Sequence, residues 1–417
     1  MGILAVNVAA CGSAAGYLAS IGKIPASLAD VQTGGMDVKV AAVIAGASGL
    51  LLGAVGIETL LYRGDQFKQK GPVSQTLELI EKSYTRSDSN IVVKDWINEY
   101  NDLHKADDPE KRNSKYAKLV NSYYELATQF YEWGWGSSFH FAYRKMGEGF
   151  GEQIRRHEYY LATFLGGLAP GSKILDVGCG IGGPYRNIAR FTGWDITGIT
   201  INEGQVRRGN ELAAQQGLAG QCRSVQGDFL ALPFEANSFD GVYAIEATCH
   251  APDRKKVYSQ IMKVLKPGAM FACYEWCLTD KYQPNNPEHR LMKKKVEEGD
   301  GLPDIAYTWD VDDALKAVGF EIVHARDMSR DPGQTMSWYL PMVPGWNPFS
   351  QRFQLTWLGK FVMNGLLSFL EGIWLLPKGT ADIHRMLQQA AIGLAAGGQS
   401  GAFTPMYLLV CRKPLKQ

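Results

Sequence analysis

The densest group of residues that could do chemistry is the segment 130–141, with the sequence FYEWGWGSSFHF. It places six aromatic residues, one acid and one histidine within twelve positions. Aromatic faces attract positive charge, and a carboxylate or an imidazole can accept a proton. The segment therefore suits an apolar ligand that passes through a cation. The alternative is that these aromatic residues form the core face of an N-terminal helix, and their spacing alone favours neither interpretation.

Two further segments carry acids and aromatic residues at the ends of predicted strands. The sequence YAIEATCH, residues 243–250, follows one apolar run, and YEW, residues 274–276, ends the next. The carboxyl ends of parallel strands meet at one edge of a sheet, where ligands bind. We therefore expect the side chains of both segments to face one cleft, although acids at strand ends often serve only as caps or packing partners.

A glycine-rich turn follows an apolar run in the sequence ILDVGCGIGG, residues 174–183. Glycine accepts unusual backbone angles and lets the chain approach a bound cofactor. The turn also matches G-x-G-x-x-G, the dinucleotide pattern, but such sites need an acid at the end of the second strand, about 20 residues on. That end reads GITIN, residues 198–202, and Asp195 lies at the opposite end of the run. A dinucleotide is therefore disfavoured.

These motifs are separated by segments that alternate between strand-like and helix-like patterns. The strand-like runs are KILDVG, DITGIT, SVQGD, GVYAIEA, MFACYEW, FEIVHA and, near the end of the chain, PMYLLVCR. Helical spacing is found over 203–216 and 255–265. This alternation predicts an α/β fold with a mostly parallel sheet. Before the last strand, residues 334–402 form an insertion rich in Trp, Phe, Leu and Gly, with an apolar stretch at 355–376 and a helix expected at 382–394.

The N-terminal part of the chain has a different character. Residues 40–57 carry no charge, and eighteen such residues approach the length needed to cross about 30 Å of hydrocarbon. The sequence predicts a membrane helix over about 38–62, with a buried or interfacial helix as the alternative. Basic residues follow the helix, which would place the rest of the protein in the cytosol. We divide the chain into an N-terminal segment (1–70), a polar linker (71–117), a catalytic domain (118–332) and a C-terminal region (333–417).

Composition narrows the function further. The 417 residues are 46% hydrophobic and 20% charged, which excludes a disordered chain. With 43 basic and 42 acidic side chains the net charge is +1, so nucleic acid is not expected as a partner. Seven cysteines without a C-x-x-C pair indicate a reducing compartment, and neither they nor the scattered histidines indicate a metal site.

Asp176, two positions before the first glycine of the turn, resembles motif I of the class I S-adenosylmethionine-dependent methyltransferases. GDF at 227–229 and FDGV at 239–242 support this resemblance, which implies a Rossmann-like seven-stranded sheet with helices on both faces. Residues 200–205, TINEGQ, are similar to the T-L-S-x-x-Q run of cyclopropane-forming and mycolic-acid methyltransferases, where the Gln serves the ribose. The resemblance implies S-adenosylmethionine as methyl donor, bound by Asp176, Gly178, Cys179, Gly180, Thr200, Ile201, Gln205, Asp228 and Phe229.

Six motifs in order resemble the sterol 24-C-methyltransferase family over roughly residues 115–414: YEWGWGSSFHF, LDVGCGIGGP, YAIEATCHAP, YEWCLTD, EEGDGLP and GAFTPMY. His157-Glu158 is similar to the family's H-E pair, whereas residues 1–70 have no counterpart. The resemblance implies methylation of C24 of a Δ24 sterol, cycloartenol- or zymosterol-type, through a cation, a hydride shift and loss of a proton, without a metal. It also implies a membrane-associated enzyme of the endoplasmic reticulum whose catalytic domain is cytosolic.

Within that scheme each polar or aromatic residue has an expected role. The catalytic candidates are Tyr131, Glu132, His140, Glu246 and His250, and the last four are alternatives for the base. The substrate candidates are Trp133, Trp135, Phe139, Tyr274, Trp276 and Trp357. The aromatic insertion would cover the sterol or face the membrane, or else pack as a second small core. The preferred sterol, the number of methyl transfers and a homo-oligomer stay open. The alternatives are a methyltransferase of another prenyl-lipid or fatty-acyl alkene and a non-catalytic sterol-binding scaffold.

Overall fold

The computed structural model describes most of the chain from residue 117 onward. The described residues are 117, 120–121, 123–124, 127–128, 131–132, 135–346, 352, 355–372 and 379–415. The membrane helix predicted over 38–62, most of the predicted linker and Trp133 lie outside them. The described positions between 117 and 132 are helical. No helix among the described residues is long and apolar enough to cross a membrane.

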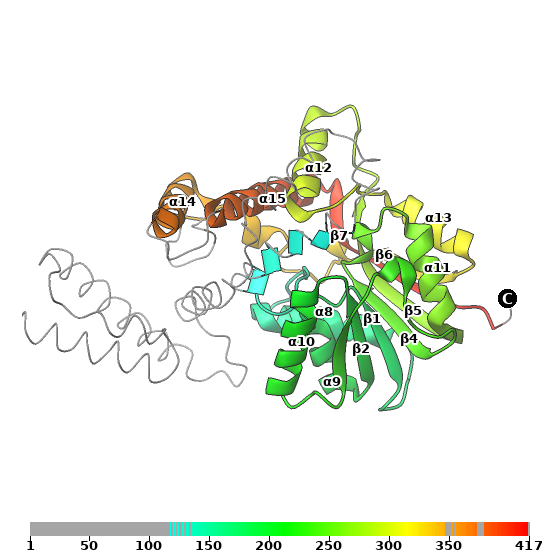
Figure 1. The fold of residues 1–417 in the computed structure, drawn as a ribbon. Coiled ribbons are helices and arrows are strands. Elements are labelled where there is room, and N and C mark those ends of the chain that lie inside the picture. The colour runs from blue at the N-terminus through cyan, green and yellow to red at the C-terminus, as the bar shows by residue number, and fades with distance from the viewer. Residues whose placement is uncertain are drawn as a thin grey trace, which may run out of the picture. The chain divides into compact units, whose positions relative to one another are not determined.

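Seven strands form one sheet in the order β3-β2-β1-β4-β5-β7-β6 (Figure 1). Strands β1 to β5 pair in parallel, and β7 is antiparallel to both of its neighbours, β5 and β6. Their bounds are β1 Lys173–Val177, β2 Asp195–Thr200, β3 Cys222–Gln226, β4 Phe239–Ile245, β5 Leu265–Leu278, β6 Glu321–Asp327 and β7 Phe403–Arg412. The predicted mostly parallel, seven-stranded α/β sheet is confirmed.

The sheet is buried on both faces because helices cover each side. Successive residues of β1 point to opposite sides, so that Ile174 enters one apolar core and Leu175 the other. Helices α8 Phe150–Thr163, α9 Gly183–Thr192 and α10 Glu203–Gln215 belong to the first side, and α11 Arg254–Val264 and α13 Thr308–Val318 to the second. This arrangement leaves the carboxyl edge of the sheet open for a site.

Side-chain caps fix where several of these helices begin. The Asn202 side chain accepts from the backbone N–H of Gln205 and starts α10, and Asp253 accepts from Lys256 and starts α11. Helix α12, Pro287–Asp300, begins after Asn286 and ends at Gly301, whose φ of +67° favours glycine. The helices at 203–216 and 255–265 were predicted, whereas α12 and α13 were not.

Two helices of the insertion precede β7. They are α14, Trp357–Gly372, and α15, Thr380–Ser400. Helix α15 packs closely on α12, since a Cβ added at Gly299 would lie 2.4 Å from the Cβ of Ala390. Figure 1 shows α14 beside α15, and the two are joined by a 3.0 Å hydrogen bond between Asn364 and His384. The insertion therefore places α15 above the open edge of the sheet and α14 on the outside of α15.

Candidate active site

The glycine turn after β1 is built so that the backbone itself forms a cavity wall. Gly178, Gly180 and Gly182 all have positive φ, at +81°, +53° and +73°. The backbone N–H groups of Gly178 and Cys179 donate to the carbonyl of Ile199 at the end of β2, across 2.9 and 3.0 Å. A Cβ at Gly178 would lie 2.3 Å from the Cβ of Ala247, so no larger residue fits there.

The end of β2 presents a polar pair where a dinucleotide site would have an acid. Thr200 donates its hydroxyl to the side-chain oxygen of Gln205 across 2.7 Å, and both residues are buried. The Gln205 amide nitrogen contacts the hydroxyl of Thr128 at 3.3 Å. These contacts fix the orientation of the Gln205 amide and place polar atoms along one side of the cavity.

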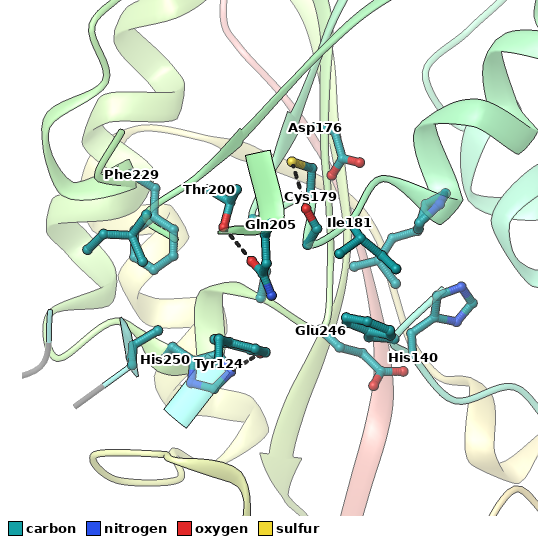
Figure 2. Close-up of a pocket in the computed structure, with 18 of the residues that line it drawn as sticks. Tyr124, His140, Asp176, Cys179, Ile181, Thr200, Gln205, Phe229, Glu246 and His250 are labelled. Carbon is teal, nitrogen blue, oxygen red and sulfur yellow. Dashed lines mark hydrogen bonds between the residues drawn. The ribbon is translucent and has the colours of Figure 1, made fainter. Parts of the chain in front are cut away.

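A first pocket lies along the carboxyl ends of the first four strands (Figure 2). It encloses about 780 Å³ of empty space, counted together with its open mouth. Figure 2 shows Phe229 on one side of this pocket and His140 on the other. All nine residues predicted to bind the cofactor line it: Asp176, Gly178, Cys179, Gly180, Thr200, Ile201, Gln205, Asp228 and Phe229. The structure therefore brings them to one cavity, and their contact with a cofactor stays a prediction.

A second pocket of about 970 Å³ continues from the first and is mainly apolar. Helix α15 supplies four aliphatic lining residues, Leu387, Ala390, Ala391 and Leu394. The predicted substrate or catalytic residues that also line it are Tyr131, Trp135, Phe139, His140, Glu246, His250 and Trp276. Because α15 belongs to the insertion, the insertion does contribute to this pocket, but through aliphatic side chains.

Five residues line both pockets and form the wall between them, which we call the shared wall: Tyr124, Phe139, His140, Glu246 and His250. A ligand in the first pocket and a ligand in the second would meet there. One phenyl ring, one hydroxyphenyl group, one carboxyl group and two imidazole rings therefore lie together at this wall. The sequence predicted four of these five residues, and only Tyr124 was missed.

Glu246 holds an unusual position immediately after β4. It is one of two non-glycine residues with positive φ among the described residues, at +53°. Its Oε1 accepts from the backbone N–H of Phe141 at 2.8 Å, and its Oε2 accepts from the Trp276 indole at 2.7 Å. Burial raises the pKa of Glu246 to about 8, and the two donors only partly oppose this. The carboxyl group is therefore both firmly held and easily protonated.

His140 forms a buried ion pair with Glu158 of α8. Its Nδ1 contacts the carbonyl of Phe141 at 3.0 Å and its Nε2 contacts Oε1 of Glu158 at 3.1 Å. Burial lowers the pKa of His140, but the hydrogen bond and charge of Glu158 outweigh burial, and the net pKa lies above its ordinary value. Both ring nitrogens face acceptors, so His140 is an imidazolium here and is a poor candidate for the base.

His250 is held in the opposite, neutral state. Its Nδ1 donates to the carbonyl of Gly301 at 3.2 Å, which leaves Nε2 to accept from the hydroxyl of Tyr124 at 3.0 Å. Burial lowers the pKa of His250 to about 4. The two histidines of the shared wall therefore carry different charges at neutral pH.

Sequence reasoning missed Asp300, the last residue of α12. The side chain is buried, lines the second pocket and accepts from the hydroxyl of Tyr131 at 3.2 Å. Burial raises the pKa of Asp300 to about 8. The EEGDGLP motif at 297–303 contained the signal, but α12 was not predicted and its direction toward the pocket could not be read from the motif.

Three predicted site residues lie elsewhere. Glu132 forms an ion pair with Arg208 of α10 and does not line either pocket, so the structure does not support it as the base. Tyr274 is fully buried and stacks on His157 at 3.8 Å, so it packs the core instead of the substrate. Trp357 lies on α14 with 70% of its side chain exposed, away from the pocket lining. Its proposed contact with the sterol is therefore not supported.

This fold and this site define a class I S-adenosylmethionine-dependent methyltransferase with an adjoining apolar pocket. A methyltransferase domain model matches residues 175–273, and a sterol methyltransferase C-terminal model matches 350–415. The cycloartenol-C-24-methyltransferase of Arabidopsis thaliana is 50% identical over 306 residues, 73% of this chain and 90% of that protein. The sterol 24-C-methyltransferase of Saccharomyces cerevisiae is 41% identical over 357 residues, 84% of this chain and 91% of that protein. The chain belongs to the sterol 24-C-methyltransferase family.

Solved structures with the same fold are more distant in sequence. A mycolic acid cyclopropane synthase aligns with a TM-score of 0.55 at 16% identity, covering 71% of this chain and 98% of its own. The [4+2]-cyclase SpnF aligns with a TM-score of 0.53 at 22% identity, covering 71% of this chain and 95% of its own. At these identities the likeness concerns the fold alone.

Proposed function

We propose that this protein transfers the methyl group of S-adenosylmethionine to C24 of a Δ24 sterol of the cycloartenol or zymosterol type. The observation that carries the proposal is the shared wall between the two pockets. A cavity behind a glycine turn, with the polar pair Thr200 and Gln205 along one side, suits the methyl donor. The adjoining cavity, lined by aromatic and aliphatic side chains, suits a sterol side chain. The transferred methyl group and the sterol alkene would face each other at that wall. The names of the curated relatives support the same substrate class.

The residues of the first pocket fit S-adenosylmethionine, which supplies an electrophilic methyl group on a sulfonium centre. Gly178 and Gly180 of the glycine turn line the pocket, where the bare backbone would let the amino-acid end of the cofactor approach closely. The oriented amide of Gln205 would hydrogen-bond to the ribose, and Asp228 and Phe229 would contact the adenine, as the family resemblance implies. Burial raises the pKa of Asp176 to about 7, so a cationic ligand beside it would favour the ionised carboxylate.

The second pocket fits the chemistry of the sterol side chain. The C24–C25 double bond takes the methyl group, which leaves a positive charge at C25, and a hydride then moves from C24 to C25. Loss of a proton from the new methyl group gives a 24(28)-methylene sterol. The faces of Phe139, Trp135 and Trp276 and the carboxyl group of Glu246 would stabilise the cation while excluding water from it.

We propose that the enzyme works at the endoplasmic reticulum membrane with its catalytic domain in the cytosol. A sterol is delivered from a lipid phase, and an apolar surface on α14 supports direct contact with lipid. Among the described residues between 346 and 369, seven large apolar side chains are exposed: Trp346, Trp357, Leu358, Phe361, Val362, Leu366 and Phe369. We call this set the α14 surface. Such a helix lies in the membrane interface, and the predicted helix over 38–62 would add a second attachment.

Activity with a panel of sterols tests the proposed reaction. The full-length protein is incubated with methyl-labelled S-adenosylmethionine and with cycloartenol, zymosterol or a 24,25-dihydro sterol. We expect labelled sterol only from the two substrates that carry the Δ24 bond, because the saturated side chain has no nucleophile. Label in the dihydro sterol, or no labelled sterol at all, would refute the proposal.

A further inference from the structure

The last step of the proposed reaction needs a base, and the second pocket offers three described groups for it. They are Glu246, His250 and Asp300. The base must accept a proton from a carbon atom within an apolar cavity, so it needs a lone pair that is free of other hydrogen bonds and directed at the ligand. The hydrogen-bond partners of the three groups distinguish them.

The acceptor atoms of Glu246 and His250 already take part in hydrogen bonds. Each carboxyl oxygen of Glu246 already accepts a hydrogen bond, one from Phe141 and one from Trp276. The only basic nitrogen of His250 accepts from the hydroxyl of Tyr124. Both hydrogen bonds to Glu246 favour its ionised form and so weaken it as a base. Protonation of Nε2 of His250 would break its buried bond with Tyr124, which costs about 1–3 kcal/mol.

Asp300 differs in having one free oxygen. Its Oδ1 accepts from Tyr131, but its Oδ2 is buried and has no hydrogen-bond partner among the residues that the structure describes. The residue is only 4% exposed and lines the second pocket. A buried acceptor without a donor is costly, so its presence at a ligand cavity indicates a use for it.

Asp300 also lies close to the shared wall. The next residue in the chain, Gly301, accepts a hydrogen bond from His250, and Tyr131 packs against Phe139 with ring centres 5.3 Å apart. The charge of Asp300 contributes to the raised pKa of Glu246. Asp300 is thus one residue away from two members of the shared wall, through Gly301 from His250 and through Tyr131 from Phe139.

We propose that Asp300 is the base that takes the proton from the newly transferred methyl group, with Tyr131 as the positioning residue for its carboxyl group. This inference rests on the proposed function. The C28–H bond breaks, its electron pair forms the C24=C28 double bond and neutralises the cation at C24, and the proton passes to Oδ2 of Asp300. A cationic ligand nearby favours the ionised carboxylate beforehand.

The first test replaces the free oxygen. In Asp300→Asn the remaining carbonyl can still accept from Tyr131, so the fold and S-adenosylhomocysteine binding are expected to persist. We expect kcat to fall at least ~100-fold with little change in the sterol KM, as for loss of a general base. The residual product should contain less 24(28)-methylene sterol and more sterol with the double bond elsewhere or with a hydroxyl group from water. Asp304→Asn, at an exposed position nearby, serves as the control.

A second test uses the pH dependence and holds even if Asp300→Asn folds poorly. The charge of Asp300 acts on four titratable groups, Tyr123, Tyr124, Tyr131 and Glu246, and His250 lies nearby through its bond to Gly301. The hydrogen bond from Tyr131 lowers the pKa of Asp300, so Tyr131→Phe should move the acidic limb of the kcat profile to higher pH. An unmoved limb would overturn the proposal. So would unchanged kcat in Asp300→Asn, or a rise in sterol KM alone, which would instead indicate an anchor for the sterol hydroxyl. Failure of the wild-type protein to methylate any sterol would refute the proposed function itself.

Discussion

Trp276 donates its indole N–H to Glu246, with Nε1 and Oε2 2.7 Å apart. The two residues come from the ends of neighbouring parallel strands, β5 and β4, and the Trp276 ring also lies 5.8 Å from that of Phe141, whose N–H holds the other Glu246 oxygen. Glu246 is therefore fixed by the aromatic segment from one side and by the sheet from the other. Glu246 lines both pockets and Trp276 lines the second, so this hydrogen bond lies where the two pockets meet.

The first prediction removes that donor. Trp276→Phe keeps an aromatic face but leaves Oε2 of Glu246 buried without its hydrogen bond, so the free energy of unfolding should fall by about 1–3 kcal/mol. Chemical denaturation measures the change, and kcat should fall with it. Trp309→Phe is the control because Trp309 is half-exposed and stacks on Tyr307, outside both pockets. Equal losses in both variants would argue against a special role for the pair.

The second prediction concerns the glycine turn. Gly178→Ala adds a Cβ where φ is +81° and where Ala247 lies 2.3 Å away. We expect affinity for S-adenosylhomocysteine to fall ~10- to 100-fold, from about 1–3 kcal/mol of strain. Isothermal calorimetry measures it, with circular dichroism as a check of folding. Gly167→Ala, with no atom within 4 Å of the added Cβ, should bind normally. Unchanged affinity in Gly178→Ala would remove the turn from the site.

The third prediction is a loss of stability with rising pH in the ligand-free protein. Burial raises the pKa of Glu246 from 4.5 to about 8, so between these values the folded protein binds a proton that the unfolded chain does not. The free energy of unfolding must then fall as pH rises, by up to ~1.4 kcal/mol per pH unit for this group. The lowered pKa of His250, about 4, acts in the opposite direction only below about pH 6.5.

Denaturation at pH 6.5 and pH 8 measures this dependence. Glu246→Gln cannot ionise, so its stability should fall less over that range than that of the wild-type protein. Glu235→Gln, at an exposed position, should retain the wild-type dependence. If Glu246→Gln and the wild-type protein lose stability equally, the carboxyl group is not protonated in the folded state.

The fourth prediction concerns the α14 surface. Replacing Trp357, Phe361 and Phe369 together by Gln should lower the rate with sterol in phospholipid vesicles at least ~10-fold, because the apolar contact with lipid is lost. The rate with sterol delivered by cyclodextrin should stay unchanged. Phe191→Gln, an exposed aromatic residue on α9, controls for surface changes elsewhere. Equal losses by both routes of delivery would indicate that α14 instead packs on another part of the protein or on a second copy.

The strands and the cofactor cavity could be predicted because their signals are local. An apolar run followed by glycines predicts β1 and its turn, and parallel strands necessarily bring Thr200 and Asp228 to the same edge. The predictions for Tyr274 and Glu132 are not supported because residue spacing does not specify which way these two side chains face. Tyr274 and Trp276 share one face of β5, but Tyr274 lies ~6.6 Å further from the strand end and is covered by His157. Glu132 follows Tyr131 on a helix, ~100° around it, and so faces Arg208 instead of the pocket.

Asp300 illustrates what the sequence could not provide. The motif around it was recognised, but its contact with Tyr131 joins residues 169 positions apart. The sequence likewise shows that the insertion is apolar. Only the structure shows that one of its helices lines the pocket while the other exposes its aromatic residues. Small and aliphatic residues of α15 line the pocket, Trp338 packs in the core, and the aromatic residues of α14 are exposed.

The most direct test of the account follows the hydrogen atoms of the transferred methyl group. The full-length protein is supplied with S-adenosylmethionine carrying a CD₃ group and with a Δ24 sterol deuterated at C24, and the product is analysed by mass spectrometry and NMR. The account predicts three deuterium atoms, two in a C28 methylene group and one moved to C25. A product that keeps an intact CD₃ group, or that lacks deuterium at C25, would contradict it.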